Sequence, residues 1–170
     1  MKKFNLVNEE ATKDLGKIIA DEISNINKES IEIHLEGELG TGKTFLTRSI
    51  IANSGWVGLV KSPTYTLCEE YDLGETIFLH IDLYRTNEIE DIHIFDLERK
   101  THSKKIIIIE WPQKLQEPRK FDLKISFKHI NNGRELNISI LIIEIKHIEN
   151  AIAIKTNISN MNFGDATKVE

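Results

Sequence analysis

The segment that decides the fold is GELGTGKT, residues 37–44. It fits G-x-x-x-x-G-K-[ST], the pattern of a phosphate-binding loop. Residues 31–36 before it alternate apolar and polar side chains as a strand does, and residues 45–52 after it are typical of a helix. The alternative is a glycine-rich turn with a helix N-cap at Thr41 or Thr44. Because a strand and a helix stand where the loop requires them, the sequence predicts nucleotide binding.

Each part of this loop has a chemical task. Gly37, Gly40 and Gly42 allow positive φ angles and a close approach of the backbone to a ligand. The resulting row of N–H groups, with the start of a helix behind it, attracts an anion. Lys43 adds a positive charge for the β- and γ-phosphates, and the Thr44 hydroxyl is suited to ligate Mg²⁺.

The composition is that of an ordinary globular chain. Its 170 residues, 40% of them apolar and 29% charged, suit one domain with a substantial core. The net charge of -5 argues against extensive contacts of this chain alone with nucleic-acid phosphates, although a partner could supply a basic surface. The single cysteine, Cys68, makes neither an internal disulfide nor a metal cluster, and a small buried role in a strand is expected for it.

Neither a secretory signal nor a membrane span is expected. The first residues lack the apolar core of a signal peptide, and the longest apolar runs, such as residues 106–109, hold about four residues. We therefore expect a cytoplasmic protein with no membrane segment.

Apolar periodicity and turn residues predict an α/β fold. Strands that alternate with few helices indicate a mixed, partly antiparallel sheet. The continuous isoleucine run within residues 105–110 predicts a strand that is buried on both faces. We expect helices at 8–26, with Asn8 as its N-cap, at 43–53 and, as a short helix, within 88–98. We expect a strand that begins at residue 31 and further strands at 65–71, 76–83, 105–110, 121–130 and 136–145, with a possible last strand at 151–154. A hairpin turn is expected at 131–133.

A threonine segment follows the loop. Residues 62–66 read SPTYT, and Pro63 favours a turn or an edge position. A threonine on such a segment, here Thr64, can present oxygen to Mg²⁺ and sense the γ-phosphate. The alternative is a serine–threonine turn beside an edge strand.

Two later strands end in carboxylates, where parallel strands deliver residues to phosphates. Asp82 could hold Mg²⁺ directly or through water; the alternative is a structural ion pair with Arg85. His80 by itself is interpreted as an ordinary strand histidine. Glu110 ends the isoleucine strand like a Walker B carboxylate and could bind Mg²⁺ through water or orient the attacking water, the alternative being a solvated strand end.

These motifs together resemble the TsaE family, the bacterial P-loop ATPases needed for threonylcarbamoyladenosine formation in tRNA. The chain carries GELGTGKT, SPTYTL, HIDLYR and IEWP in the family's order, and residues 9–16 and 133–135 also resemble it. The resemblance covers about residues 5 to 145 and implies a P-loop NTPase-like three-layer sandwich. It divides the chain into an ATPase domain, 1–145, and a C-terminal extension, 146–170.

The resemblance also implies an activity and partners. A family member binds and hydrolyses ATP with Mg²⁺ and works with the TsaB–TsaD pair, so that it meets tRNA only through the complex and is not itself the transferase. Trp111 is expected beside the site. The resemblance implies ATP contacts for Glu38, Leu39, Gly40, Thr41, Gly42, Lys43, Thr44 and Phe45, and nucleoside contacts for Thr12 and Arg134. It implies γ-phosphate, catalytic or metal-binding roles for Thr64, Asp82 and Glu110. Thr44 is also expected to ligate the metal.

Two other classes of P-loop protein fit the loop less well. A small GTPase switch would share the threonine segment, but no N-K-x-D motif follows the loop; the one Asn-Lys pair, Asn27-Lys28, precedes it. A small-molecule kinase usually carries an arginine-bearing lid, and no clear lid segment stands out. The sequence therefore favours ATP over GTP.

Overall fold

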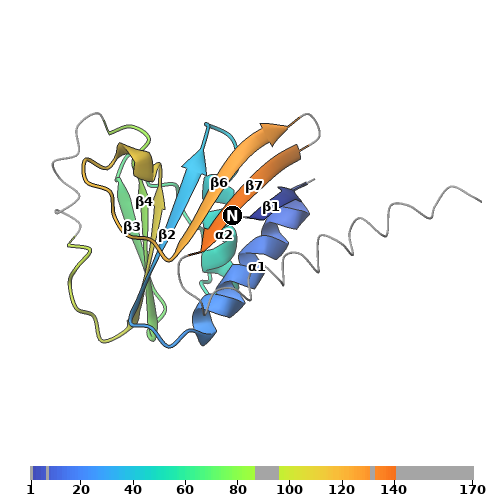
Figure 1. The fold of residues 1–170 in the computed structure, drawn as a ribbon. Helices are drawn as coiled ribbons and strands as arrows, with labels where there is room; N and C mark the ends of the chain where they lie inside the picture. Colours follow the sequence, from blue (N-terminus) through green and yellow to red (C-terminus); the bar gives the residue numbers. More distant parts are fainter. Residues whose placement is uncertain (1, 7, 87–95, 131–132, 141–170) are drawn as a thin grey trace, which may run out of the picture.

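A mixed sheet of seven strands forms the centre of the structure (Figure 1), a computed structural model that describes residues 2–6, 8–86, 96–130 and 133–140. The sheet order is β1-β7-β6-β2-β5-β4-β3. The elements are β1 (Lys2–Leu6), α1 (Glu9–Asn25), β2 (Ser30–Gly37), α2 (Lys43–Asn53), β3 (Cys68–Asp72), β4 (Thr76–Asp82), β5 (Lys104–Glu110), a short 3₁₀ helix (Pro112–Lys114), β6 (Leu123–Ile130) and β7 (Gly133–Ile140).

The middle of the sheet is parallel and its margins are antiparallel. β2 pairs in parallel with β5 and β6, and β4 pairs in parallel with β5. β3, β7 and β1 join by antiparallel pairing with β4, β6 and β7. The expected α/β fold with a mixed, partly antiparallel sheet is therefore confirmed. Because β2, β4 and β5 run in one direction, their carboxyl ends reach the same edge of the sheet.

Helix α1 begins as its sequence predicts. The Asn8 side chain accepts a 2.9 Å hydrogen bond from the Ala11 N–H group, and Glu9 and Glu10 occupy the first turn. Apolar residues at helical spacing, Leu15 and Ile19 among them, are buried against the sheet.

The two α-helices lie together on one face of the sheet (Figure 1). They touch closely because Gly16 has no side chain: a Cβ atom there would stand 2.2 Å from Ser49 Oγ. The Ser49 hydroxyl donates a 3.1 Å hydrogen bond to the Lys13 carbonyl across the same contact. This pair of residues fixes how α2, and hence the loop before it, sits on the sheet.

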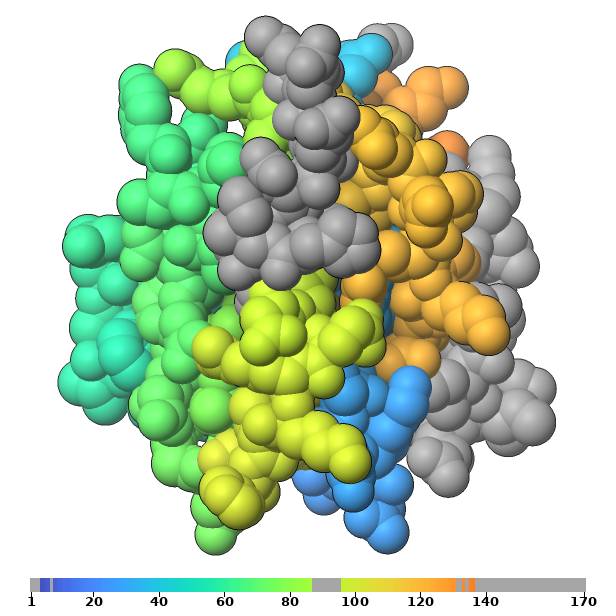
Figure 2. Space-filling view, turned by 90° about the vertical axis from the view of Figure 1, so that its left-hand side faces the viewer, coloured from blue at the N-terminus to red at the C-terminus, as the bar shows by residue number. Residues whose placement is uncertain are grey.

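The opposite face carries a second apolar cluster. Ile107 and Ile109 point to this face, whereas Ile106 and Ile108 pack under the helices, so the isoleucine strand is buried on both sides as expected. Within the described residues, irregular segments and the 3₁₀ helix cover the second cluster, contributing Leu83, Leu97 and Leu115. Figure 2 shows the yellow-green segment after residue 96 lying across this side of the molecule.

Three local predictions differ from the structure. β1 was not expected from the sequence; it pairs with β7 across Phe4 and Leu136. The strand expected at 65–71 starts only at Cys68, since a turn closed by the Leu67 N–H and the Pro63 carbonyl, at 2.6 Å, precedes it. Cys68 is therefore half-buried rather than buried.

Some expectations fall outside the described residues. They concern most of the short helix within 88–98, the end of the strand 136–145, the possible strand 151–154 and the extension 146–170. No helix in the described part of the chain combines the length and the apolar character that a membrane span requires.

Candidate nucleotide-binding site

The loop between β2 and α2 adopts the conformation that its glycines permit. The φ angles of Gly37, Gly40 and Gly42 are +136°, +77° and +98°. Gly37 also lies against β6, because a Cβ atom there would stand 2.6 Å from the Phe127 carbonyl oxygen. Gly42, not Thr41 or Thr44, is the N-cap of α2, and it offers no side chain to the N–H groups of the first turn. Those N–H groups lack partners within the helix and are suited to donate hydrogen bonds to a bound anion.

Lys43 lies between the loop and an aromatic ring. Its Nζ atom donates 2.8 Å hydrogen bonds to the Gly37 and Glu38 carbonyls and stands 4.2 Å from the centre of the Trp111 ring. Burial lowers the pKa of the Lys43 ammonium group below its usual value, while the negative charges of Glu110 and Asp82 act in the opposite direction. The ammonium charge is therefore held close to two carboxylates.

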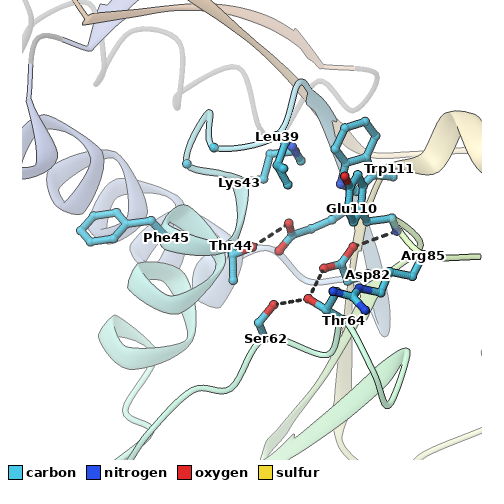
Figure 3. Close-up of a pocket in the computed structure, with 13 residues that line it drawn as sticks. Leu39, Lys43, Thr44, Phe45, Ser62, Thr64, Asp82, Arg85, Glu110 and Trp111 are labelled. Atoms are coloured by element: carbon cyan, nitrogen blue, oxygen red, sulfur yellow. Dashed lines mark hydrogen bonds between the residues drawn. The ribbon is translucent and has the colours of Figure 1, made fainter.

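Thr44 and Glu110 join the start of α2 to the end of β5. The Thr44 hydroxyl donates a 2.9 Å hydrogen bond to Glu110 Oε2 (Figure 3). The other carboxylate oxygen, Oε1, lies 2.8 Å from His80 Nε2. Glu110 is buried, with 1% of its surface exposed, so it is no solvated strand end.

Asp82 and Thr64 form a second polar pair beside the first. The Thr64 hydroxyl donates a 3.1 Å hydrogen bond to Asp82 Oδ2, and Ser62 Oγ lies 2.8 Å from Thr64 Oγ1 (Figure 3). Asp82 Oδ1 accepts a hydrogen bond from the Tyr84 N–H group. The Arg85 guanidinium group stacks on Tyr65, 4.4 Å from the ring centre, instead of pairing with Asp82.

These groups line one cleft of about 490 Å³. Ser62, Tyr84, Arg85 and Trp111 complete its wall. Trp111 has a left-handed backbone (φ 62°, ψ 46°), which turns the chain sharply after β5 and brings its ring to 5.1 Å from Tyr84. The site residues expected from the sequence that line the cleft are Leu39, Gly40, Gly42, Lys43, Thr44, Phe45, Thr64, Asp82, Glu110 and Trp111.

Four residues named from the sequence lie elsewhere. The Glu38 carbonyl accepts a 2.8 Å hydrogen bond from the Thr41 hydroxyl, so both residues shape the loop from outside the cleft lining. Thr12 is buried in α1, and its hydroxyl donates to the Asn8 carbonyl at 3.4 Å. Arg134 pairs through its backbone with Leu6 and His129, while its side chain lies outside the described part of the structure. Nucleoside contacts by Thr12 and Arg134 stay predictions.

Sequence reasoning missed the role of His80 and the contribution of Tyr84. His80 lies two residues before Asp82 on β4, and only the pairing of β4 with β5 brings it to Glu110. The alternation of His80 and Asp82 on one face of a strand is the signal that could have revealed it.

The donor atoms of the cleft are hard oxygens. The Thr44 hydroxyl and the carboxylates of Glu110 and Asp82 suit Mg²⁺, which prefers few protein ligands together with phosphate oxygens and water. Within the described residues no cluster of three or more His, Cys, Asp or Glu side chains could hold a metal ion by itself. Such a site fits a metal that arrives with a phosphate ligand.

Comparisons with known proteins agree on one family. The family described as "Threonylcarbamoyl adenosine biosynthesis protein TsaE" matches residues 6–136. The tRNA threonylcarbamoyladenosine biosynthesis protein TsaE of Haemophilus influenzae is 39% identical over 102 residues, which are 59% of this chain and 65% of that protein. Its Bacillus subtilis counterpart is 34% identical over 116 residues, 68% of this chain and 69% of that protein.

A solved structure gives the same answer for the fold. The crystal structure of YdiB from Bacillus subtilis superposes with a TM-score of 0.67 at 25% sequence identity, covering 91% of this chain and 95% of that one. The family match contains the phosphate loop, Thr64, Asp82 and Glu110, the groups that meet in the cleft. The chain therefore belongs to the TsaE family.

Proposed function

We propose that this chain binds ATP with Mg²⁺, hydrolyses it, and thereby serves the formation of threonylcarbamoyladenosine in tRNA. The observation that carries this proposal is the meeting of the phosphate loop with Thr64, Asp82 and Glu110 in one cleft. Membership in the TsaE family supports the biological setting.

Binding falls to the loop and the start of α2. The N–H groups of residues 40–44 surround the phosphates, and Lys43 exchanges the Gly37 and Glu38 carbonyls for the β- and γ-phosphate oxygens. Thr44, with Asp82 and Glu110 near it, would hold Mg²⁺, which when bound neutralises phosphate charge. The Phe45 side chain extends from the start of α2 to the side away from the carboxylates (Figure 3), and we expect it to contact the ATP molecule there.

Hydrolysis falls to the two carboxylates and to Thr64. Glu110, fixed by hydrogen bonds at both oxygens, is suited to orient the attacking water. Thr64, which donates to Asp82, is suited to respond to the γ-phosphate. Because phosphoryl transfer depends on positioning, a site that partners complete is slow by itself, and we expect weak hydrolysis by the isolated chain.

The partner proteins are expected to supply the tRNA-binding surface and the transferase activity. A net charge of -5 is unfavourable for tRNA binding, so the TsaB–TsaD pair is expected to hold the tRNA and carry out the transfer. The ATP cycle of this chain would then drive turnover of that complex in the cytoplasm.

The deciding experiment is multiple-turnover threonylcarbamoylation of tRNA by the cognate TsaB and TsaD proteins with supplied threonylcarbamoyl-adenylate. Product beyond one equivalent of complex should require this chain and ATP, and should fail with the Glu110→Ala variant. Product formation that is indifferent to this chain would refute the proposed role.

A further inference from the structure

His80 is a fully buried imidazole in contact with the candidate catalytic carboxylate. Its exposed fraction is 0%, and its Nε2 atom lies 2.8 Å from Glu110 Oε1. Its Nδ1 atom has no hydrogen-bond partner among the described residues. Among the described residues, the contact with Glu110 is therefore the side-chain hydrogen bond that the His80 imidazole makes.

Strand pairing sets this contact. β4 and β5 run in parallel with His80 opposite Ile108 and Asp82 opposite Glu110. The side chains of alternate residues share a face, so His80 lies on the helix-facing side with Phe78, which is part of the apolar core. An apolar side chain would satisfy packing at this depth, whereas a polar one is stable only with a hydrogen-bond partner.

The chemistry of the pair fixes which atom donates. We assign the donor role to His80 Nε2, because a carboxylate oxygen accepts hydrogen bonds and the buried Nδ1 atom has no partner among the described residues to which it could donate. Nδ1 is then a bare lone pair, which is less costly to bury than an unpaired N–H group.

The two donors to Glu110 differ in what else they do. Thr44 donates to Oε2, but the proposed function uses the same hydroxyl to ligate Mg²⁺. His80 has no such second task and lies beneath the cleft, outside its lining. A hydroxyl that ligates a metal through a lone pair can still donate its O–H to a carboxylate. His80 would therefore hold Glu110 Oε1 while Thr44 holds Oε2, and His80 is the donor of the two that has no metal role.

We propose that His80 is a positioning residue that holds the Glu110 carboxylate in the orientation required for ATP hydrolysis. This inference rests on the proposed ATPase function. It requires that loss of the Nε2–H donor slows the chemical step and leaves nucleotide binding nearly intact.

Two substitutions separate the hydrogen bond from packing. His80→Leu fills the space without a donor, and His80→Gln carries an amide N–H near the place of Nε2. We expect the single-turnover rate constant for ATP hydrolysis to fall roughly 10- to 100-fold in the leucine variant and to stay within about threefold of wild type in the glutamine variant. The ATP dissociation constant should change less than about threefold in both. His102→Leu, at an exposed position, is the matched control.

A double-mutant comparison tests whether His80 acts through Glu110. In a Glu110→Ala background, His80→Leu should cause no further loss of rate, because the carboxylate that it positions is gone. Equal rates in the leucine and glutamine variants, an undiminished rate in the leucine variant, or additive losses in the double variant would each overturn the positioning role.

A spectroscopic readout does not depend on hydrolysis. Long-range ¹H–¹⁵N spectra of the wild-type chain should show His80 protonated at Nε2 and bare at Nδ1, with the signal assigned by its absence in His80→Gln. A proton on Nδ1 would overturn the inference even if the leucine variant does not fold. Absence of hydrolysis by the wild-type chain, alone and with its partners, would instead refute the proposed function, and the spectrum would still report the contact.

Discussion

The Thr44 hydroxyl donates to Glu110 Oε2 at 2.9 Å, although 66 positions separate the two residues in the chain. The contact joins the first turn of α2 to the end of β5. It places a hydroxyl that suits Mg²⁺ against a carboxylate that suits water orientation, so the proposed binding and hydrolysis would meet at a single hydrogen bond.

Removing the carboxylate should separate these two activities. In Glu110→Ala we expect the rate constant of ATP hydrolysis to fall about 100-fold or more, while the ATP dissociation constant stays within about threefold, because a water-orienting group acts on the chemical step. Quenched-flow hydrolysis and calorimetric titration measure the two quantities. Glu117→Ala, at an exposed site, is the control, and wild-type turnover in Glu110→Ala would exclude Glu110 from the mechanism.

The lysine of the loop should decide nucleotide binding itself. Lys43→Ala removes the ammonium group that lies among the loop carbonyls, and we expect ATP affinity to fall about 100-fold or more. Isothermal titration with ATP and Mg²⁺ measures the loss, with Lys120→Ala as a surface control. Unchanged affinity in Lys43→Ala would show that the nucleotide binds elsewhere.

Base preference distinguishes this chain from a GTPase switch. No N-K-x-D motif follows the phosphate loop, so the motif by which small GTPases recognise guanine is missing there. Competition titrations should give ATP at least about tenfold higher affinity than GTP, a difference of roughly 1.4 kcal/mol. Comparable affinities would favour the GTPase alternative.

The contact between α1 and α2 predicts a stability effect. Gly16→Ala places a methyl group 2.2 Å from Ser49 Oγ and 3.1 Å from the Ile50 nitrogen, so the helices must separate. We expect a loss of about 1–3 kcal/mol in the free energy of unfolding, despite the better helix propensity of alanine. Urea denaturation measures it, and exposed Lys17→Ala in the same helix is the control. A Gly16→Ala protein as stable as wild type would contradict the close packing.

A buried ion pair makes stability depend on pH. Burial raises the pKa of Glu32, but hydrogen bonds from His34 and Arg119, and the charge of Arg119, outweigh it, so the pKa lies below its usual 4.5. Arg119 Nη2 lies 2.7 Å from Glu32 Oε2. A carboxyl group with a lowered pKa stabilises the folded state above its unfolded pKa, and this contribution is lost as the pH falls through the lowered value.

In the Glu32→Gln variant, the free energy of unfolding should therefore depend less on pH in the acid range. At pH 7 the variant should be less stable by about 2 kcal/mol, since a hydrogen-bonded charge is lost, and this gap should shrink below about pH 5. Denaturant titrations at several pH values measure both. A gap that is constant from neutral to acid pH would show that Glu32 is not the group that titrates.

The sequence predicted those parts of the fold that local patterns determine. Helix α1, helix α2 and strands β2 and β5 carry their periodicity and end signals within their own residues, and their bounds agree closely with prediction. β1 could not be predicted in this way, because it is a strand through its pairing with β7, whose residues come more than 100 positions later. The late start of β3 reflects a turn at Leu67, which has an unusual φ of +62°.

The same distinction holds for the site. The phosphate loop, Asp82 and Glu110 were predicted because their residue types follow strands, and Thr64 because it lies on a threonine segment downstream of the loop. The contact of His80 with Glu110 could not be predicted, because it depends on the register between β4 and β5 and on the face that each side chain occupies. A histidine inside a strand gives no local sign of its partner.

The central place of β2 has a consequence for synthesis of the protein. Its neighbours in the sheet, β5 and β6, begin at Lys104 and Leu123, far along the chain from the phosphate loop at residues 37–44. Parallel pairing over such a separation must first overcome the entropy of closing a long loop. A nascent chain that stops before Lys104 carries the whole GELGTGKT motif yet has neither Glu110 nor the strands that hold the loop. We expect such a fragment to be unable to capture ATP, so that the proposed nucleotide cycle would begin only after β5 and β6 have been synthesised.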